Sequence, residues 1–233
     1  MRGRRSGVKS IKSQNIRHTL NELFGSYELL VDKADAAFQE MQKSHRTYIK
    51  CERRCSDCCH AVFGLFLIEA AYLNEQFDRL SSEEKKSALL RCDEADMGLK
   101  RLERMLKEFE DDPHMQSYTM AKERIRCPLL DDEEECILYA HRPVTCRVYG
   151  IPTRIQGKAR VCGKARFKKG EAYPVFDLDG VYRDLYLISK ELLSITQEGN
   201  PEKASLMISI SKALRTPLDG LICETFGSLG GVP

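Results

Sequence analysis

Eight of the ten cysteines in this chain fall into two groups whose spacing suits metal coordination. The first group lies in the run CERRCSDCCH, spaced C-x3-C-x2-C-C, and consists of Cys51, Cys55, Cys58 and Cys59. The second lies in CPLLDDEEECILYAHRPVTCRVYG and the later RVCGK, and consists of Cys127, Cys136, Cys146 and Cys162. Thiolates are soft, charged donors for zinc and iron, and four of them complete a tetrahedral zinc site or an iron–sulfur cluster. Eight are enough for two such centres.

The adjacent pair Cys58–Cys59 is unusual for a chelate to one ion, because neighbouring side chains diverge. It therefore predicts either two metal centres or one spare thiol beside a single centre. Neither group has the spacing of a common zinc finger or ferredoxin, so the pattern predicts a metal without identifying it. Of the two remaining cysteines, Cys92 is expected as a buried thiol on an apolar helix face. Cys223 has no cysteine neighbour and is expected to be incidental.

Basic residues flank both cysteine groups. They are Arg53, Arg54, His60, His141, Arg142, Arg147, Arg160 and Lys164. Positive neighbours lower the pKa of a thiol and offset the charge of bound sulfur. Arg147 and Tyr149 follow Cys146 directly and are candidate hydrogen-bond donors behind the thiols. The acidic run 131–135 is typical of a solvated turn rather than a carboxylate ligand set.

Helices are predicted to position the first cysteine group. Residues 13–50 form a long helix with an a/d seam. Its members are Ile16, Leu20, Leu23, Tyr27, Leu30, Ala34, Ala37 and Met41. If the helix extends, the same register places Cys51, Cys55 and Cys58 on its core-facing side. A second helical stretch follows over 62–79. A third helix starts at a capping box, Ser81 with Glu84, ends near 111–113 and is expected antiparallel to the first.

The second cysteine group lies in a segment of different character. Residues 127–180 are punctuated by Gly, Pro and Cys and predict irregular backbone with short helices or strands. Helices return at 181–198 and from Pro201 to about Arg215, with Asn200 as N-cap. The fold class is therefore mainly α, a helical hairpin or bundle with an irregular cysteine-rich metal-binding segment. We expect a basic flexible tail at 1–12, one helical domain at 13–215 with its metal-binding region at 51–165, and a flexible tail at 216–233.

Composition narrows the function classes. Lys and Arg number 37 and Asp and Glu 35, a formal net charge of +2, so no specific nucleic-acid binding is expected. The basic N-terminus has no apolar stretch after its paired arginines, as a secretory signal would require. The mostly apolar run 61–73 contains Glu69 and is too short to span a bilayer. We therefore expect a cytoplasmic protein without membrane contact, and a reducing cytoplasm disfavours disulfides. The oligomeric state stays open.

The cysteine runs carry a family resemblance. The C-x3-C-x2-C-C run, then CPLLD…C-x-x-Y-x-x-RP-x-x-CR-x-YG and a further cysteine, resemble the YkgJ-type cysteine-cluster family over about residues 51–165. This zinc- or iron-chelating family of bacteria and archaea includes flagellin lysine N-methylases. The resemblance implies chelation by Cys55, Cys58, Cys59, Cys127, Cys136 and Cys146. It implies that Cys162 completes the set and that Cys51 is a further candidate.

The resemblance also bears on activity. In the flagellin-methylase relatives the domain is associated with an iron–sulfur centre and with methyl transfer from S-adenosylmethionine to lysine. It thereby implies S-adenosylmethionine as a cofactor and a protein as substrate or partner, although no S-adenosylmethionine pocket is identifiable in the sequence.

Three functions are consistent with these residues. The favoured one is an iron–sulfur or iron protein with a redox or methyl-transfer role. The second is a zinc-stabilised helical module that presents a surface to a protein partner without catalysis, and the third is a thiol-based redox switch. Metal content, sulfide content and colour distinguish them.

Overall fold

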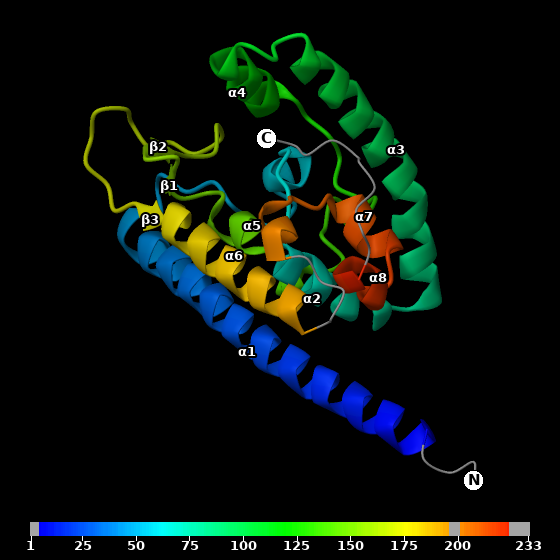
Figure 1. Cartoon of the computed structure of the whole chain (residues 1–233). Helices are drawn as coiled ribbons and strands as arrows, with labels where there is room; N and C mark the ends of the chain where they lie inside the picture. The colour runs from blue at the N-terminus through cyan, green and yellow to red at the C-terminus, as the bar shows by residue number, and fades with distance from the viewer. Residues whose placement is uncertain (1–4, 196–200, 224–233) are drawn as a thin grey trace.

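The long N-terminal helix lies along one side of the molecule in the computed structural model, which describes residues 5–195 and 201–223 (Figure 1). This helix, α1, spans Arg5–His45 and so begins within the segment 1–12 that was expected to be a tail. Its buried positions follow the predicted seam from Leu20 to Met41, whereas Ile16 is exposed. The seam packs α1 against the rest of the core.

The predicted extension of α1 into the cysteine run is wrong. The helix ends at His45, and residues 46–56 form turns and extended backbone. The Cys55 amide donates to the Glu52 carbonyl at 2.9 Å, which closes a turn in which Arg54 has a φ of 67°. A non-glycine residue in this left-handed region interrupts any right-handed helix. Cys58 and Cys59 instead lie in a short 3-10 helix, η1 (Asp57–His60), so no helical register aligns the thiols.

The central element is α2 (Leu67–Asp78), which is buried on nearly every face. It begins later than the predicted residue 62, because 61–66 are extended and Leu65 pairs with Ile208. The next helix, α3 (Ser82–Lys107), starts at the predicted capping box, with the Ser81 amide donating to Glu84 at 3.0 Å. A separate helix, α4 (Pro113–Lys122), begins after its N-cap Asp112.

The predicted antiparallel pairing of α3 with α1 is wrong. Figure 1 shows the two helices on opposite sides of the molecule, with α2 between them. α1 packs on α2, α5 (Val144–Val148) and α6 (Leu178–Ser194), whereas α3 packs on α4 and α7 (Ile210–Arg215). Because α2 is buried on nearly every face, it fills the centre and separates α1 from α3.

The C-terminal third departs from prediction in two places. The helix α6 is confirmed, but the helix expected over 201–215 is two pieces, η3 (Pro201–Ser205) and α7. The break lies at Ile208, whose backbone is bound in both directions by Leu65, and Ser209 caps α7. The expected cap Asn200 lies outside the described residues. A last helix, α8 (Leu218–Cys223), buries Leu221 and Ile222, so this part of the expected tail is folded.

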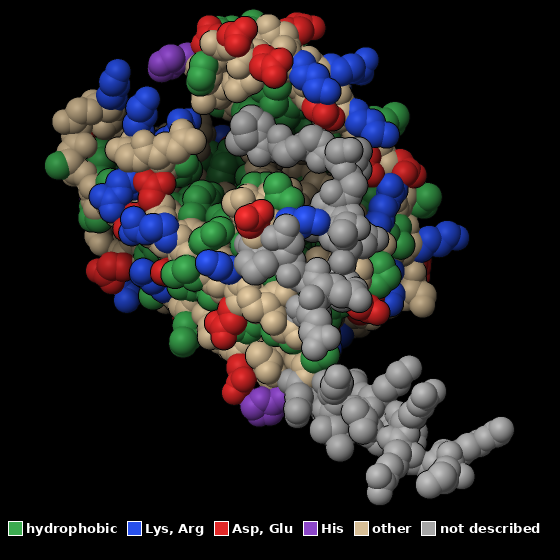
Figure 2. Space-filling view, in the orientation of Figure 1, with side chains coloured by type: hydrophobic (Ala, Val, Ile, Leu, Met, Phe, Trp, Pro, Cys, Tyr) green, Lys and Arg blue, Asp and Glu red, His purple; other side chains and the backbone are tan. Residues whose placement is uncertain are grey.

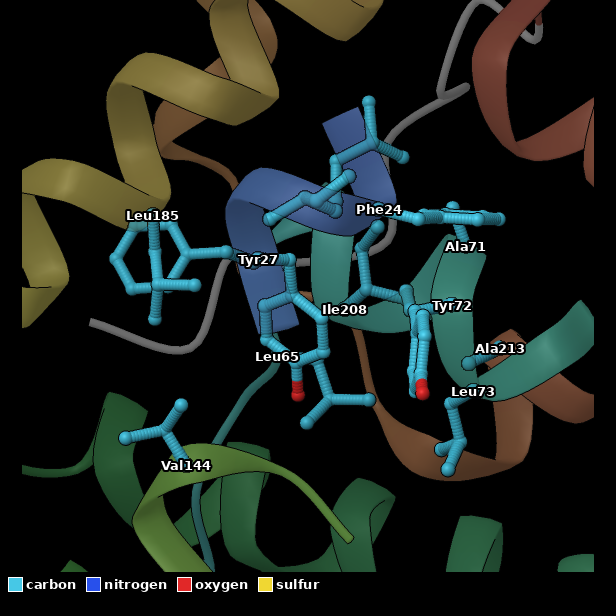
Figure 3. Close-up of a cluster of buried hydrophobic side chains, with 14 of the residues drawn as sticks. Phe24, Tyr27, Leu65, Ala71, Tyr72, Leu73, Val144, Leu185, Ile208 and Ala213 are labelled. Carbon is cyan, nitrogen blue, oxygen red and sulfur yellow. The ribbon is translucent and has the colours of Figure 1, made fainter. Parts of the chain in front are cut away.

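The core joins α1, α2, α5, α6 and the segment around residue 208, as Figure 3 shows. The rings of Tyr27 and Tyr72 lie 4.9 Å apart, and Phe24 meets Tyr72 edge-on at 5.4 Å. Val144, at the start of α5, is fully buried in the same core. The helix that carries Cys146 is therefore fixed to the body of the protein by apolar packing.

The segment 127–180 is irregular, as predicted. It contains a 3-10 helix η2 (Tyr139–His141), α5, and a small sheet of β1 (Thr153–Ile155), β2 (Lys158–Arg160) and β3 (Phe176–Asp177) in the order β2-β1-β3. β1 is antiparallel to β2 and parallel to β3. The predicted fold class, mainly α with an irregular cysteine-rich segment, is confirmed. Among the described residues, no helix combines the length and the apolar character needed to cross a membrane.

Candidate metal centre

Five cysteines from residues 58–59 and 127–146 lie near enough to affect one another's pKa, and we call them the inner cysteines: Cys58, Cys59, Cys127, Cys136 and Cys146. Backbone pairing brings these two parts of the sequence together. The Cys127 amide donates to the Cys59 carbonyl at 2.7 Å, and the Ile125 amide donates to the His60 carbonyl at 3.1 Å. Ala61 forms an antiparallel bridge with Arg124. The end of η1 is thus paired directly with the chain that leads into Cys127.

A tight loop brings Cys136 back next to the segment that carries Cys127. Leu130 bridges to Cys136, and the Ile137 amide donates to the Leu129 carbonyl at 2.9 Å. The acidic run between the two cysteines forms the predicted turn: the Asp131 carboxylate accepts from the amides of Glu133 and Glu135 at 3.1 and 2.8 Å. Its acidic residues therefore fold the loop locally.

Cys146 is positioned by the residues on either side of it in α5. The Val144 amide donates to Glu69 Oε1 at 3.1 Å, and Glu69 Oε2 accepts from the Phe66 amide at 3.2 Å. Arg147 is buried and donates to Asp35 Oδ2 at 2.5 Å and to two backbone carbonyls. Arg147, predicted as a donor behind the thiols, thus clamps α5 to α1 and to η2.

Glu69 is a site residue that the sequence analysis missed. It is the one carboxylate in the apolar run 61–73, and burial raises its pKa to about 7. A carboxylate in such a run is a usable signal, because a buried acid must have hydrogen-bond partners. Here its partners are the amides of Phe66, the N-cap of α2, and of Val144, the first residue of α5, so Glu69 joins the central helix to the helix that carries Cys146.

We expect Glu69→Gln to lower the free energy of unfolding by about 2 kcal/mol, because a glutamine offers one acceptor oxygen to two buried amide donors. Urea unfolding at pH 8, where a carboxyl with a pKa of about 7 is ionised, measures the loss. Glu83→Gln on the exposed start of α3 is the control and should change stability by under about 0.5 kcal/mol. Equal stability of the two variants would show that Glu69 does not join α2 to α5.

Most inner thiols are held in their protonated form. Burial raises the pKa of Cys127 to about 12 and that of Cys136 to about 11, and it raises the pKa of Cys146 well above the ordinary value. Nearby thiols add to these shifts: Cys136 acts on Cys127, and Cys58 acts on both Cys136 and Cys146. The inner sulfurs therefore lie within reach of one another's charge.

The pKa values of the adjacent cysteines Cys58 and Cys59 are shifted in opposite directions. The Cys59 thiol donates a hydrogen bond to Cys58, which lowers the pKa of Cys58 to about 7 and raises that of Cys59. Arg142 further lowers the pKa of Cys58.

The other three cysteines of the predicted set, Cys51, Cys55 and Cys162, form a second group next to Cys58, and we call them the outer cysteines. The Cys162 thiol donates to Asp57 Oδ2 at 3.0 Å and accepts from the Lys164 amide at 3.3 Å. Cys55, Cys162 and Cys58 all contribute to raising the pKa of Cys51, after burial. Cys58 therefore adjoins both groups, and Cys162 faces a carboxylate.

Asp57 is a second residue that the sequence analysis missed. Its carboxylate is paired with Arg124 at 2.8 Å and lies 4.0 Å from Lys164, in addition to its bond from Cys162. The predicted donor Tyr149 lies beside Asp57 and Cys162, which both raise its pKa after burial does. No spacing rule identifies Asp57, since it is one of many acids in the chain.

Position 150 has no room for a side chain because of one outer cysteine, Cys51. A Cβ at this position would lie 2.1 Å from Cys51 Sγ. The sulfur of Cys51 thus packs against the glycine that follows α5, although the residue as a whole is exposed. This contact connects the first cysteine of the first run to the end of the second.

We expect Gly150→Ala to cost about 1–3 kcal/mol of folding stability, because the added methyl must displace the Cys51 sulfur. Gly163→Ala is the matched control, since no atom lies within 4 Å of its added Cβ. Adding Cys51→Ala to Gly150→Ala should recover most of the loss. Denaturant midpoints measure all three, and a double variant as unstable as the single one would contradict the contact.

The donor set of the inner cysteines fits a thiolate-bound metal. Within residues 5–195 and 201–223, no three Cys, His, Asp or Glu side chains are already arranged as ligands of one ion. What the structure brings together is five sulfurs on backbone that is anchored by hydrogen bonds, in surroundings that favour the neutral thiol until a cation binds. The assignment of the eight cysteines as ligands stays a prediction.

Cys92 is not part of the predicted set, although it adds to the rise in the pKa of Cys127. Cys92 is fully buried on α3, as predicted for a packed thiol, and burial raises its pKa to about 11. The side chain of Cys223 lies outside the part of the chain whose side chains are described.

These features define a mainly helical protein with a partly buried, cysteine-rich site at the junction of η1, the 124–137 loop and α5. Residues 50–163 match the model of the CxxCxxCC family, described as "Putative zinc- or iron-chelating domain". The match assigns this segment to that family and confirms the resemblance inferred from the cysteine pattern. No curated protein and no solved structure matches the chain at a significant level.

The family's name also shows where this chain departs from the pattern. A C-x2-C-x2-C-C run ending at Cys59 would begin at residue 52, which is Glu52 here, and the first cysteine is Cys51 instead. The left-handed Arg54 lies in the extra-long interval between Cys51 and Cys55. The turn at Arg54 therefore accommodates the additional residue.

Proposed function

We propose that the inner cysteines hold a thiolate-bound metal centre, with an iron–sulfur cluster or iron as the favoured occupant and zinc as the alternative. The observation that carries the proposal is that five cysteines from two distant parts of the sequence, residues 58–59 and 127–146, lie near one another. Backbone pairing at Cys59 and Cys127 and the anchoring of α5 by Glu69 support a site whose segments are held next to one another by the fold.

Metal binding accounts for the inner thiols better than a thiol redox switch does. A reactive cysteine needs a low pKa and solvent access, whereas burial raises the pKa of Cys127, Cys136 and Cys146. Only Cys58 among the inner cysteines has a lowered pKa. Coordination removes the proton from a thiol outright, so it makes use of buried sulfurs that are poor nucleophiles. The proposal places the protein in a reducing cytoplasm, where such thiols stay free.

The identity of the bound metal decides between two roles for the protein. Iron–sulfur clusters held by cysteine carry out electron transfer, whereas a zinc ion in a closed four-cysteine site stabilises the fold. The cationic Arg142 lowers the pKa of Cys58 and of Cys136, so it would also offset the charge of sulfur bound to iron. The irregular backbone of 124–150 favours the alternative, because a structural zinc site adds folding free energy where regular elements are few.

The residues of the chain itself would hold, orient and shield the centre. Glu69 and Arg147 fix the helix that carries Cys146, and the turn at Asp131 fixes the loop that carries Cys136. The methyl transfer and the protein substrate implied by the family resemblance stay expectations, since no described residue identifies an S-adenosylmethionine site.

Anaerobic purification followed by iron, zinc and acid-labile sulfide analysis, with a visible spectrum, tests the proposal. Iron and sulfide in comparable amounts with broad visible absorbance would identify a cluster. One zinc per chain in a colourless protein would support the alternative. A folded, metal-free protein with all its thiols titratable would contradict both.

A further inference from the structure

A cavity of about 380 Å³ opens beside Cys55 at the edge of the cysteine region. Its walls are strongly basic, with one acidic residue, Glu52, among five cations: Lys50, Arg53, Arg54, Lys164 and Arg166. This volume is within the range of small-molecule sites, but such sites are usually apolar. Walls that are this rich in positive charge suit a charged ligand of opposite sign.

Part of this positive charge has no counter-charge in the protein. Arg53 donates to Glu135 at 2.6 Å, Arg54 lies 3.8 Å from the same carboxylate, and Lys164 lies 4.0 Å from Asp57. Among the described residues, no carboxylate lies within ion-pair distance of Lys50 or Arg166. These two cations are free to bind an anion that enters the cavity.

The two segments that carry the cations are held together by backbone and aromatic contacts. The Arg166 amide donates to the Tyr48 carbonyl at 2.8 Å, and the next ring, Phe167, stacks on Tyr48 at 5.5 Å. Tyr173 closes this cluster edge-on against Phe167 at 4.9 Å. The cavity is therefore formed before a ligand arrives, which lowers the entropic cost of binding.

The cations do not simply neutralise buried sulfur. The side chains of Arg53 and Arg54 are 81% and 65% exposed, so their charge faces solvent. Figure 2 shows Lys and Arg side chains gathered around the β1–β2 end of the molecule, near the loop that follows β2. A field of this kind attracts anions from solution.

We propose that this cavity binds a small anion that carries phosphate or carboxylate groups, with Lys50 and Arg166 as its main ligands. The guanidinium group of Arg166 can donate two parallel hydrogen bonds to either oxyanion. The proposal goes beyond the metal centre and does not depend on it, since none of the five cations is a metal donor.

Isothermal titration calorimetry on the full chain as purified tests the site, with inorganic phosphate and succinate as separate probes. We expect at least one probe to bind, with an affinity that falls as salt is raised. Binding of phosphate alone or of succinate alone would each support the site and would identify the ligand class. The variant Lys50→Gln/Arg166→Gln should bind that probe at least tenfold more weakly.

The matched control is Lys86→Gln/Lys100→Gln on the exposed face of α3, which removes the same charge elsewhere and should bind within twofold of the wild type. Metal content is measured in parallel in every variant and should not change. Three outcomes would overturn the proposal: no binding of either probe, an equal loss in the control, or loss of metal from the Lys50→Gln/Arg166→Gln variant. The last would show that the cations serve the sulfur site.

Discussion

Cys146→Ser should reduce the metal content of the purified protein to less than about a tenth of the wild-type value. Serine preserves the shape of the side chain but does not ionise, so it cannot replace a soft thiolate donor. The residues beside Cys146 in α5 are also anchored, Val144 by Glu69 and Arg147 by Asp35, so the sulfur has a defined position. Elemental analysis of anaerobically purified protein measures the change.

Cys92→Ser is the matched control for this substitution, since it changes another buried thiol in the same way outside the inner cysteines. It should leave the metal content unchanged. The variant Cys58→Ser tests the other end of the site. It should also lose the metal when it is compared with Cys92→Ser. Equal metal content in Cys146→Ser and Cys92→Ser would show that α5 does not take part in binding.

Removal of the metal by a chelator should unfold the cysteine region while the helical core persists. The binding free energy of a thiolate metal site is coupled to the folding of its loops. The segment 124–150 contains few regular elements, whereas α6 is held by the core around Leu185 and Leu192. We expect the melting temperature to fall by about 10 °C or more, since a loss of a few kcal/mol shifts a chain of this size by that amount.

Hydrogen exchange measured by mass spectrometry before and after chelation locates this loss. Peptides from 124–150 should exchange at least tenfold faster in the metal-free protein, and peptides from 178–194 should be unchanged. Uniform acceleration across both regions would indicate that the metal stabilises the whole domain. Unchanged exchange at 124–150 would contradict a metal centre at the inner cysteines.

A metal site could be predicted from the cysteine pattern, because closely spaced thiols have few other uses in a reducing compartment. The seam of α1 and the capping box of α3 were also predictable, since both depend on local residue types. The irregular segment 127–180 was predictable from its Gly, Pro and Cys residues. These features require no knowledge of distant contacts.

Other features depend on contacts that local patterns do not encode. An a/d seam specifies that a helix has a partner but does not say which one, so α3 was wrongly paired with α1. The register was carried through Cys51 to Cys58 because nothing in the residue types marks Arg54 as left-handed. The break before α7 depends on the pairing of Ile208 with Leu65, which lie 143 residues apart in the sequence.

The division of the eight cysteines into inner and outer groups was also beyond sequence reasoning. The family resemblance joined both runs in one chelating set that also included Cys55 and Cys162, whereas the structure groups Cys58 and Cys59 with Cys127, Cys136 and Cys146. The adjacent pair is therefore the point at which the two runs join. The role of Glu69 was detectable, because a single acid in an apolar run requires partners.

X-ray absorption spectroscopy at the edge of the bound metal tests the central claim most directly. The inner cysteines predict a first shell dominated by sulfur, with about four scatterers at about 2.3 Å from the metal. Cys146→Ser should lose this shell, and Cys92→Ser should keep it. A first shell of nitrogen and oxygen alone in the wild-type protein would contradict a thiolate centre at this site.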